Sequence, residues 1–307
     1  MKAEATGGRD VRTLDAGGGW PDGWPAAQLD ALLAAFLAED IGSGDITSEV
    51  CLPPGLRARG VLVAKQAGVV AGLPVARRVF GLVDPQTVWT AQAEDGVRVP
   101  GRPHRELAEV RGTARALLRA ERVALNLLQR LSGVATATAR AVAAAGTVQV
   151  LDTRKTTPGL RWLEKYAVRV GGGRNHRFGL DDGILIKDNH IRAVGGVAAA
   201  VERARAQGPQ GLRIEVECTT LAEVDAAVAA GAEIVLLDNM DPGLLRQSVQ
   251  RIAGRARVEA SGGITPDNLA EVAACGVDAV SLGALTHSAP ALDLSLEIEA
   301  EEAEGEL

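Results

Sequence analysis

The chain has 307 residues, 47% of them hydrophobic and 23% charged, which is enough for a full core in one large domain or two medium ones. The formal net charge of −6 argues against a general nucleic-acid binder, because such proteins usually carry a net basic domain. The chain has three widely spaced cysteines, which predict free thiols in a reducing compartment. We find neither the apolar core of a signal peptide nor an apolar run near the ~20 residues of a membrane helix, so we expect a cytoplasmic location.

The first part of the chain predicts a lead-in, a helix and a small sheet. Residues 1–25 are rich in Gly, Asp and Arg without periodicity, so we expect a disordered or loosely packed lead-in. Helical apolar spacing begins after Pro25. Short β-type runs separated by turn signals occupy residues 58–112 and predict an antiparallel sheet. Residues 115–133 then predict a long helix that could join two domains.

The pattern changes after residue 145. Short apolar runs recur at 148–152, 184–188, 213–218, 233–238, 257–261 and 279–283, and Ala-rich helical stretches separate the last five. This alternation is typical of parallel strands joined by crossover helices. Six or seven such units, without a dinucleotide-binding Gly fingerprint after the first strand, favour a βα barrel over an open doubly wound sheet.

Polar residues follow each of these predicted strands, where the working residues of βα barrels collect. The strand ends read Asp152-Thr153-Arg154-Lys155, Lys187-Asp188-Asn189-His190, Glu215-Val216-Glu217, Asp238-Asn239, Glu259-Ala260-Ser261-Gly262-Gly263 and Gly283. Six successive strand ends, five of them with charged residues and the last with Gly283, predict a shared polar ligand.

The charge balance indicates that this ligand is an anion. Between Arg154 and Arg192 the chain has nine Lys/Arg against four Asp/Glu, although the whole chain is acidic. The segment "GGGRNHRFG" at 171–179 is not a helix face, and its glycines are typical of a loop that brings backbone close to a ligand. The alternative is a salt-bridged surface.

Two further strand ends predict a phosphate site. "ASGGIT" at 260–265 ends a strand in Ser-Gly-Gly, and we expect a helix to begin near Thr265-Pro266-Asp267 with its N–H groups close to a phosphate. Gly283 follows the next strand, and barrels commonly bind phosphate at their last two strands. The alternative is a simple turn.

Glu217 and Asp238 end neighbouring predicted strands, so we expect them side by side at the barrel mouth. Paired carboxylates in a cationic site suit ribose hydroxyls or Mg²⁺. The alternative is that each carboxylate bonds a neighbouring Arg, an interpretation that fits Glu215 best.

Several stretches of the chain resemble the quinolinate phosphoribosyltransferase family, also called nicotinate-nucleotide pyrophosphorylase (carboxylating). They are "AEDIGSGDITS", "AERVALNLLQRLSGVAT", "DTRKTTPGLRWLEKYAVRVGGGRNHRFGL", "LIKDNH", "LLDN", "ASGGIT" and "LGALTHSAPALDLSL". They extend from about residue 29 to 298, and "DTRKT", "GGGxNHR" and "KDNH" in this order are highly specific.

The resemblance implies an α/β fold with an N-terminal α/β sandwich domain at 26–130, to which 289–307 return, and a C-terminal open, TIM-like βα barrel at 131–288. It implies transfer of phosphoribose from phosphoribosyl pyrophosphate to quinolinate, with loss of pyrophosphate and CO2, giving nicotinate mononucleotide for NAD synthesis. It also implies Mg²⁺ as cofactor and a homodimer or a higher assembly.

The resemblance assigns residues as follows. Quinolinate would contact Arg122 of the neighbouring subunit, Thr153, Arg154, Lys155, His176, Arg177 and Lys187. Phosphoribosyl pyrophosphate would contact Lys155, Lys187, Asn189, Glu217, Asp238, Ser261, Gly262, Gly263, Gly283 and His287. Lys155, Glu217 and Asp238 would be catalytic, and the two carboxylates would bind the metal. Arg174 departs from the family, which usually has a small or apolar residue there.

Three alternatives stay open at this point. A paralogous phosphoribosyltransferase or pyrophosphorylase would use a different acceptor. A Schiff-base lyase on a barrel would use Lys155 or Lys187, although that chemistry needs a lysine in an apolar pocket. A sensor would bind a phosphorylated ligand without turnover.

Overall fold

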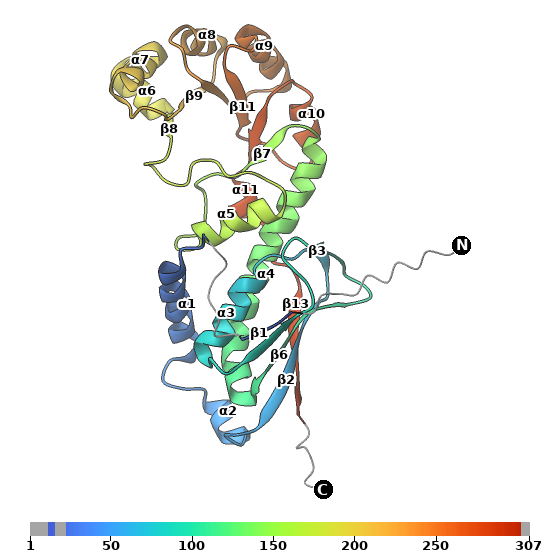
Figure 1. Ribbon diagram of the computed structural model, residues 1–307. Coiled ribbons are helices and arrows are strands. Elements are labelled where there is room, and N and C mark those ends of the chain that lie inside the picture. Colours follow the sequence, from blue (N-terminus) through green and yellow to red (C-terminus); the bar gives the residue numbers. More distant parts are fainter. Residues whose placement is uncertain (1–11, 16–22, 302–307) are drawn as a thin grey trace, which may run out of the picture. The chain divides into compact units, whose positions relative to one another are not determined.

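The computed structural model describes residues 12–15 and 23–301 (Figure 1). These residues divide into two compact units. The residues up to Thr136 and those from Pro290 form the first unit, and Ala137–Ala289 form the second. The first unit therefore contains both ends of the described chain.

The first unit contains the predicted antiparallel sheet. Its five strands lie in the order β1 (Arg12–Asp15), β4 (Val88–Ala91), β6 (Arg105–Thr113), β2 (Arg57–Ala64) and β13 (Leu294–Ala300). Two short strands, β3 (Ala67–Val69) and β5 (Arg98–Pro100), form a separate antiparallel pair. β13 pairs with β2 along its whole length, from Leu294 opposite Ala64 to Ala300 opposite Ala58, which returns the end of the chain to this sheet (Figure 1).

Part of the expected lead-in has regular structure. Arg12–Asp15 form β1, which pairs antiparallel with β4 in place of the loose segment that the composition predicted. The Gly- and Asp-rich composition has no strand periodicity, so the pairing partner 73 or more residues away could not be foreseen. Residues 1–11 and 16–22 lie outside the described residues.

Three helices lie wholly in the first unit: α1 (Ala26–Ile41), α2 (Ile46–Cys51) and α3 (Leu73–Val83). The fourth helix, α4 (Ala114–Ala145), begins in the first unit. α1 buries Leu29, Leu33 and Leu37, which share one helix face because they lie four residues apart. Asp45 caps α2 by accepting from the Ser48 N–H at 3.0 Å. α4 contains the predicted long helix and extends into the second unit.

The second unit is an open parallel sheet wrapped by helices. Its six strands lie in the order β7 (Gln149–Leu151), β12 (Ala279–Ser281), β11 (Arg257–Ser261), β10 (Ile234–Asp238), β9 (Ile214–Cys218) and β8 (Ile184–Ile186). All five pairings are parallel, and each strand lies in one of the six predicted apolar runs. β7 and β8 are edge strands; an isolated bridge from Leu151 to Arg174 extends the β7 edge.

The crossover helices are α5 (Arg161–Val170), α6 (Asp188–Val194), α7 (Val197–Gln207), α8 (Leu221–Ala229), α9 (Pro242–Ile252), α10 (Leu269–Ala273) and α11 (Ala284–His287). Figure 1 shows α7, α8 and α9 on the outer side of the sheet. The sequence sets two of their starts: Thr220 and Glu223 form a capping box at α8, and Asp241 precedes a proline at α9.

The helix expected near Thr265 begins later, at Leu269. The Asn268 side chain accepts from the Thr265 N–H at 2.8 Å and donates to the Gly263 carbonyl at 3.0 Å, which holds residues 263–268 as a turn. α10 has only five residues, so the expected helix N-terminus at the Gly-Gly turn was wrong.

The described cysteines are free thiols, as predicted: Cys51 is exposed, and Cys218 and Cys275 are buried. Burial raises the pKa of the Cys218 thiol to about 12, so this group is an inert core residue. None of the helices in the described ranges combines the length and apolarity needed to span a membrane.

Candidate active site

A cavity of about 620 Å³ lies at the carboxyl ends of the parallel strands. Eleven predicted site residues line it: Thr153, Arg154, Lys155, His176, Arg177, Lys187, Glu217, Asp238, Ser261, Gly262 and Gly263. Five residues that were not assigned a role line it too: Leu185, Leu236, Asn239, Glu259 and Ser281. The five cations expected at the barrel rim therefore converge on one hollow of the second unit.

Four assigned residues do not line this cavity. Asn189 lies in α6, where its Oδ1 accepts from Arg192 at 2.6 Å. Gly283 and His287 lie beside Lys155, since a Cβ placed on Gly283 would stand 2.8 Å from Lys155 Cδ and 3.2 Å from the His287 ring. Arg122 is an exposed residue of α4 in the first unit, so the geometry of the cavity does not include it.

Three cations in the cavity lack a compensating carboxylate. Among the described residues, no Asp or Glu lies within ion-pair distance of Arg154, Lys155 or Arg177. The Nε atoms of both arginines are buried without a hydrogen-bond partner. Burial and the neighbouring Arg154 charge lower the pKa of Arg177. This excess of positive charge matches a ligand with at least two negative groups.

Helix α5 anchors the loop that carries the first two of these cations. Glu164 is fully buried, and its carboxylate accepts from the Thr157 N–H at 3.0 Å and from the Thr157 hydroxyl at 2.8 Å. Thr286 donates its hydroxyl to the Lys155 carbonyl at 2.7 Å. The loop 152–160 is thus held from two sides, which fixes the backbone positions from which the side chains of Arg154 and Lys155 extend.

Lys165, the next residue of α5, anchors the loop that contains His176. Lys165 is 3% exposed; its ammonium donates to the fully buried Asp152 and, at 3.0 Å, to the His176 carbonyl. Asp152 also accepts from the Asn175 amide at 2.5 Å and from the His176 N–H at 2.9 Å. From the sequence, no role was predicted for Lys165, Asp152 or Asn175. Glu164 and Lys165 are adjacent charges among apolar helix positions, which was an available signal of buried polar anchors.

Glu217 and Asp238 lie on neighbouring strands and line the same cavity, as expected. Lys187 pairs with Glu217 at 2.7 Å, and Asp238 accepts from the Asn239 amide at 2.7 Å. Asn239 has a left-handed backbone, with φ of 53°. Gly262 has φ of 84°, and a Cβ there would stand 2.3 Å from Asn239 Oδ1, so this turn requires glycine.

At one wall of the cavity, His176 contacts two buried carboxylates. Its Nε2 lies 3.1 Å from Glu215 Oε2 and 3.6 Å from Glu259 Oε1. The interpretation that Glu215 bonds an arginine was therefore wrong, because among the described residues its ion-pair partner is His176. Burial opposes charge on His176, but the hydrogen bond and charge of Glu215 outweigh it and raise its pKa. Burial, then the Glu215 charge, raise the pKa of Glu259 to about 7.

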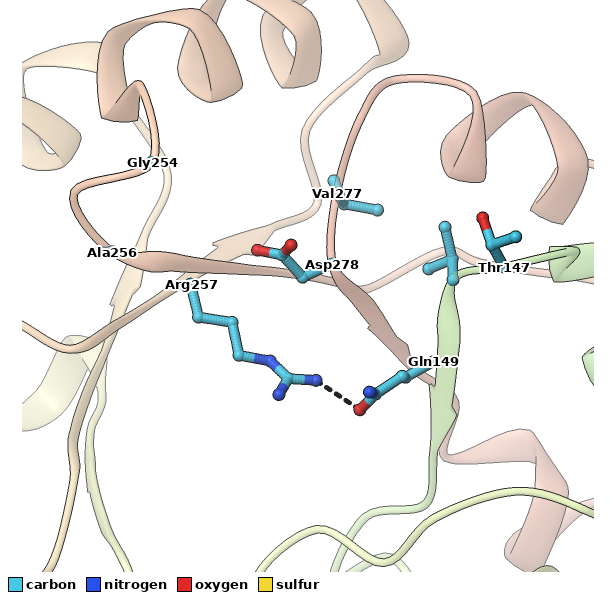
Figure 2. Close-up of a pocket in the computed structure, with 8 residues that line it drawn as sticks. Thr147, Gln149, Gly254, Ala256, Arg257, Val277 and Asp278 are labelled. Atoms are coloured by element: carbon cyan, nitrogen blue, oxygen red, sulfur yellow. Dashed lines mark hydrogen bonds between the residues drawn. The ribbon is translucent and has the colours of Figure 1, made fainter.

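The strands' amino ends carry other hollows. One of about 570 Å³ is lined by residues that include Gln149, Arg257 and Asp278, and Arg257 donates to Gln149 at 2.6 Å (Figure 2). Arg174, the departure from the resembled family, lines another of about 420 Å³ and not the larger cavity. Because βα barrels carry out their chemistry at the carboxyl ends of strands, we assign the site to the 620 Å³ cavity.

Fold and cavity together define a βα-barrel protein with a cleft lined by cationic side chains. The models of the quinolinate phosphoribosyl transferase N-terminal and C-terminal domains match residues 45–132 and 134–297. The chain belongs to the quinolinate phosphoribosyltransferase family. The predicted family and the predicted α/β fold class are thus confirmed.

Named relatives agree with this assignment. The chain is 44% identical over 273 residues to a probable nicotinate-nucleotide pyrophosphorylase (carboxylating) of Bacillus subtilis, covering 88% of this chain and 93% of that one. It is 38% identical to a mitochondrial quinolinate phosphoribosyltransferase (decarboxylating) of Nicotiana tabacum, covering 98% and 90%. The solved structure of NadC from Streptococcus pyogenes superimposes with a TM-score of 0.87 at 45% identity, covering 92% of this chain and 100% of that one.

Proposed function

We propose that this protein transfers phosphoribose from phosphoribosyl pyrophosphate to the nitrogen of quinolinate, with release of pyrophosphate and CO2, and so forms nicotinate mononucleotide for NAD synthesis. The observation that carries the proposal is that Arg154, Lys155 and Arg177, which have no ion-pair partner among the described residues, line one cavity with Glu217 and Asp238. The names of the family and of its relatives support the same reaction.

The cations would bind the acceptor. Quinolinate carries two adjacent carboxylates, and the planar forks of Arg154 and Arg177 suit carboxylates better than a point charge does. Desolvating these anions without cations would be prohibitive. Lys155 and Lys187 carry compact charges on flexible stems, which suits a charge that moves as pyrophosphate leaves.

Glu217 and Asp238 would face the ribose, and Ser261, Gly262 and Gly263 the 5′-phosphate. As the bond to pyrophosphate breaks, C1′ gains positive character, and a nearby carboxylate stabilises it. Positioning of two bound substrates would supply most of the acceleration, without a covalent enzyme intermediate. Once the ring nitrogen is substituted, its positive charge stabilises the electron pair that departing CO2 leaves on the adjacent ring carbon, and this carbon then takes up a proton to give the product.

Glu217 and Asp238 are also the residues that would hold Mg²⁺. Their hard carboxylate oxygens line one cavity, and Mg²⁺ prefers such oxygens together with substrate phosphate oxygens. When bound, Mg²⁺ would supply positive charge to the leaving pyrophosphate. Lys187 lies 2.7 Å from Glu217, so an ion bound by this carboxylate would have to compete with the lysine.

We further propose a homodimer in which Arg122 reaches the acceptor site of the neighbouring subunit. The exposure of Arg122 supports this, because an exposed guanidinium is available to a neighbouring subunit. The cytoplasmic location stays a prediction.

The decisive experiment incubates the purified protein with quinolinate, phosphoribosyl pyrophosphate and Mg²⁺ and follows nicotinate mononucleotide and pyrophosphate by chromatography. We expect both products in equal amounts, and none after chelation of Mg²⁺. Nicotinate in place of quinolinate is the control for the acceptor. Turnover of nicotinate but not quinolinate would replace the proposal by the paralogous enzyme, and binding without pyrophosphate release would favour the sensor.

The Schiff-base lyase is the least consistent alternative. Its lysine needs a pKa lowered by an apolar environment. Burial lowers the pKa of Lys165, but this residue is bonded to Asp152 and does not line the cavity. Trapping with borohydride and a carbonyl substrate should therefore leave the protein unlabelled.

A further inference from the structure

Both ring nitrogens of His176 are engaged within the protein. The Arg177 backbone N–H donates to Nδ1 at 2.7 Å, so Nδ1 uses its lone pair as an acceptor. The proton of the neutral ring then sits on Nε2, which lies 3.1 Å from Glu215 Oε2. A ring held in this way has no nitrogen left for a substrate.

The two carboxylates belong to almost completely buried residues that also border hollows of the barrel. Glu215 is 5% and Glu259 is 2% exposed. Glu215 Oε1 and Glu259 Oε1 are buried without a hydrogen-bond partner in the described structure. Two buried acids so close together are costly, and the raised pKa of Glu259, about 7, reflects that cost. Glu215 in β9 and Glu259 in β11 stand on either side of β10, and such a pair of buried acids calls for a role.

A metal ion does not fit that role. The ligand atoms of His176, Glu215 and Glu259 lie within 4.8 Å of one another, close enough for an ion. However, a metal would need the Nε2 lone pair, and with Nδ1 already accepting a hydrogen bond the ring would have to lose its last proton. The geometry is that of a hydrogen-bonded triad.

We infer that Glu215 and Glu259 are positioning residues for the acceptor: they hold the Nε2–H of His176 inside the barrel, so that the ring offers only carbon atoms and its face to the cavity, while Nδ1 fixes the Arg177 backbone. This inference rests on the proposed function for the identity of the acceptor. It departs from the expectation that His176 itself binds a quinolinate carboxylate, and it leaves that task to the guanidinium groups.

The distances rank the two acids. Glu215 is the closer acceptor, at 3.1 Å against 3.6 Å for Glu259, so its removal should release the ring more completely. Loss of a hydrogen bond to a charged group corresponds to a change of about tenfold or more in binding. Because the ring stands beside Arg177, this change should appear in KM for quinolinate and not in KM for phosphoribosyl pyrophosphate.

The first test needs no substrate. The chain has four histidines, so protein labelled with ¹⁵N-histidine gives a simple long-range ¹H–¹⁵N spectrum. At pH 8 we expect the signal that disappears in His176→Asn to show a proton on Nε2 and none on Nδ1. His104→Asn, on an exposed residue of the first unit, is the assignment control and should leave that signal unchanged. A His176 proton on Nδ1 would overturn the inference, whatever reaction the enzyme catalyses.

The second test uses a matched pair of variants. Glu215→Gln keeps a carbonyl oxygen that can accept from Nε2–H, whereas Glu215→Leu does not. We expect Glu215→Leu to raise KM for quinolinate at least about tenfold, with a shifted His176 Nε2–H signal, and Glu215→Gln to stay within about threefold of the parent. An unchanged KM in folded Glu215→Leu, or an equal loss in both variants, would contradict a positioning role. If Glu215→Leu does not fold, the tautomer of the parent protein remains a test, because a His176 proton on Nδ1 overturns the inference.

Discussion

Replacing Lys165 by methionine should cost much more stability than its place on a helix would indicate. The change keeps the length of the side chain but removes a buried ammonium from between Asp152 and the His176 carbonyl. Asp152 is fully buried, so its carboxylate would lose its only ion-pair partner among the described residues. Removing one member of a buried pair costs roughly 3–5 kcal/mol. Asp152 keeps the Asn175 amide and the His176 N–H, which favours the lower end, about 3 kcal/mol.

The assay is urea unfolding followed by far-UV circular dichroism, with parent, Lys165→Met and Asp152→Asn/Lys165→Met compared. We expect the double variant to regain part of the lost free energy, because it no longer buries an uncompensated charge. Burial already raises the pKa of Asp152, and without Lys165 it should rise further. Because the pKa of Asp152 is higher in the folded protein than its value near 3.8 in the unfolded chain, the folded state is favoured when Asp152 is protonated. As pH rises and the buried carboxyl group ionises, the free energy of unfolding falls. The deficit of the single variant should therefore be larger at pH 8 than at pH 5.

Two results would refute this reasoning. One is a single variant within about 1 kcal/mol of the parent at pH 8, since a surface pair is worth that little. The other is a double variant less stable than the single one, which would mean that the carboxylate stabilises the loops without its cation.

Four further outcomes are expected. Lys155→Ala should lower turnover by at least about a hundredfold with little change in unfolding midpoint, and equal activity in the folded variant would remove this lysine from the site. Gly262→Ala should cost about 1–2 kcal/mol and weaken phosphoribosyl pyrophosphate binding, because its Cβ meets Asn239 Oδ1 at 2.3 Å and φ is 84°; an unaltered KM would show that the turn is not used. Mixing inactive Arg122→Ala with inactive Lys155→Ala should partly restore activity in mixed dimers, and no rescue in proven heterodimers would count against a shared site. The pKa of Glu259 is raised from 4.5 to about 7, so its protonated form stabilises the fold, and this contribution is lost as pH rises through 7. Glu259→Gln should therefore flatten the fall in the free energy of unfolding between pH 5 and 8. Parallel curves for parent and variant would contradict the raised pKa.

The local order of the chain could be predicted from the sequence because it depends on neighbouring residues. Strand and helix alternate with the apolar periodicity, and all six barrel strands lie in predicted runs. Placing polar residues at strand ends then predicted the cavity, since the carboxyl ends of parallel strands share one edge of a sheet. The same reasoning failed for the turn at Thr265, where the Asn268 side chain competes with a helix start.

Only the tertiary structure decided which charges face the ligand and which support the loops. Arg154 and Lys165 look alike in the sequence, yet one lacks a carboxylate partner in the cavity and the other is buried against Asp152. Likewise, Glu215 and Glu217 stand two residues apart on one strand, but they meet His176 and Lys187 respectively. Charge and periodicity are properties of the chain, whereas the pairing of a buried charge depends on what distant segments bring to it. That is why the sequence determined the family, the fold and the sign of the site, and the folded chain alone determined its partners.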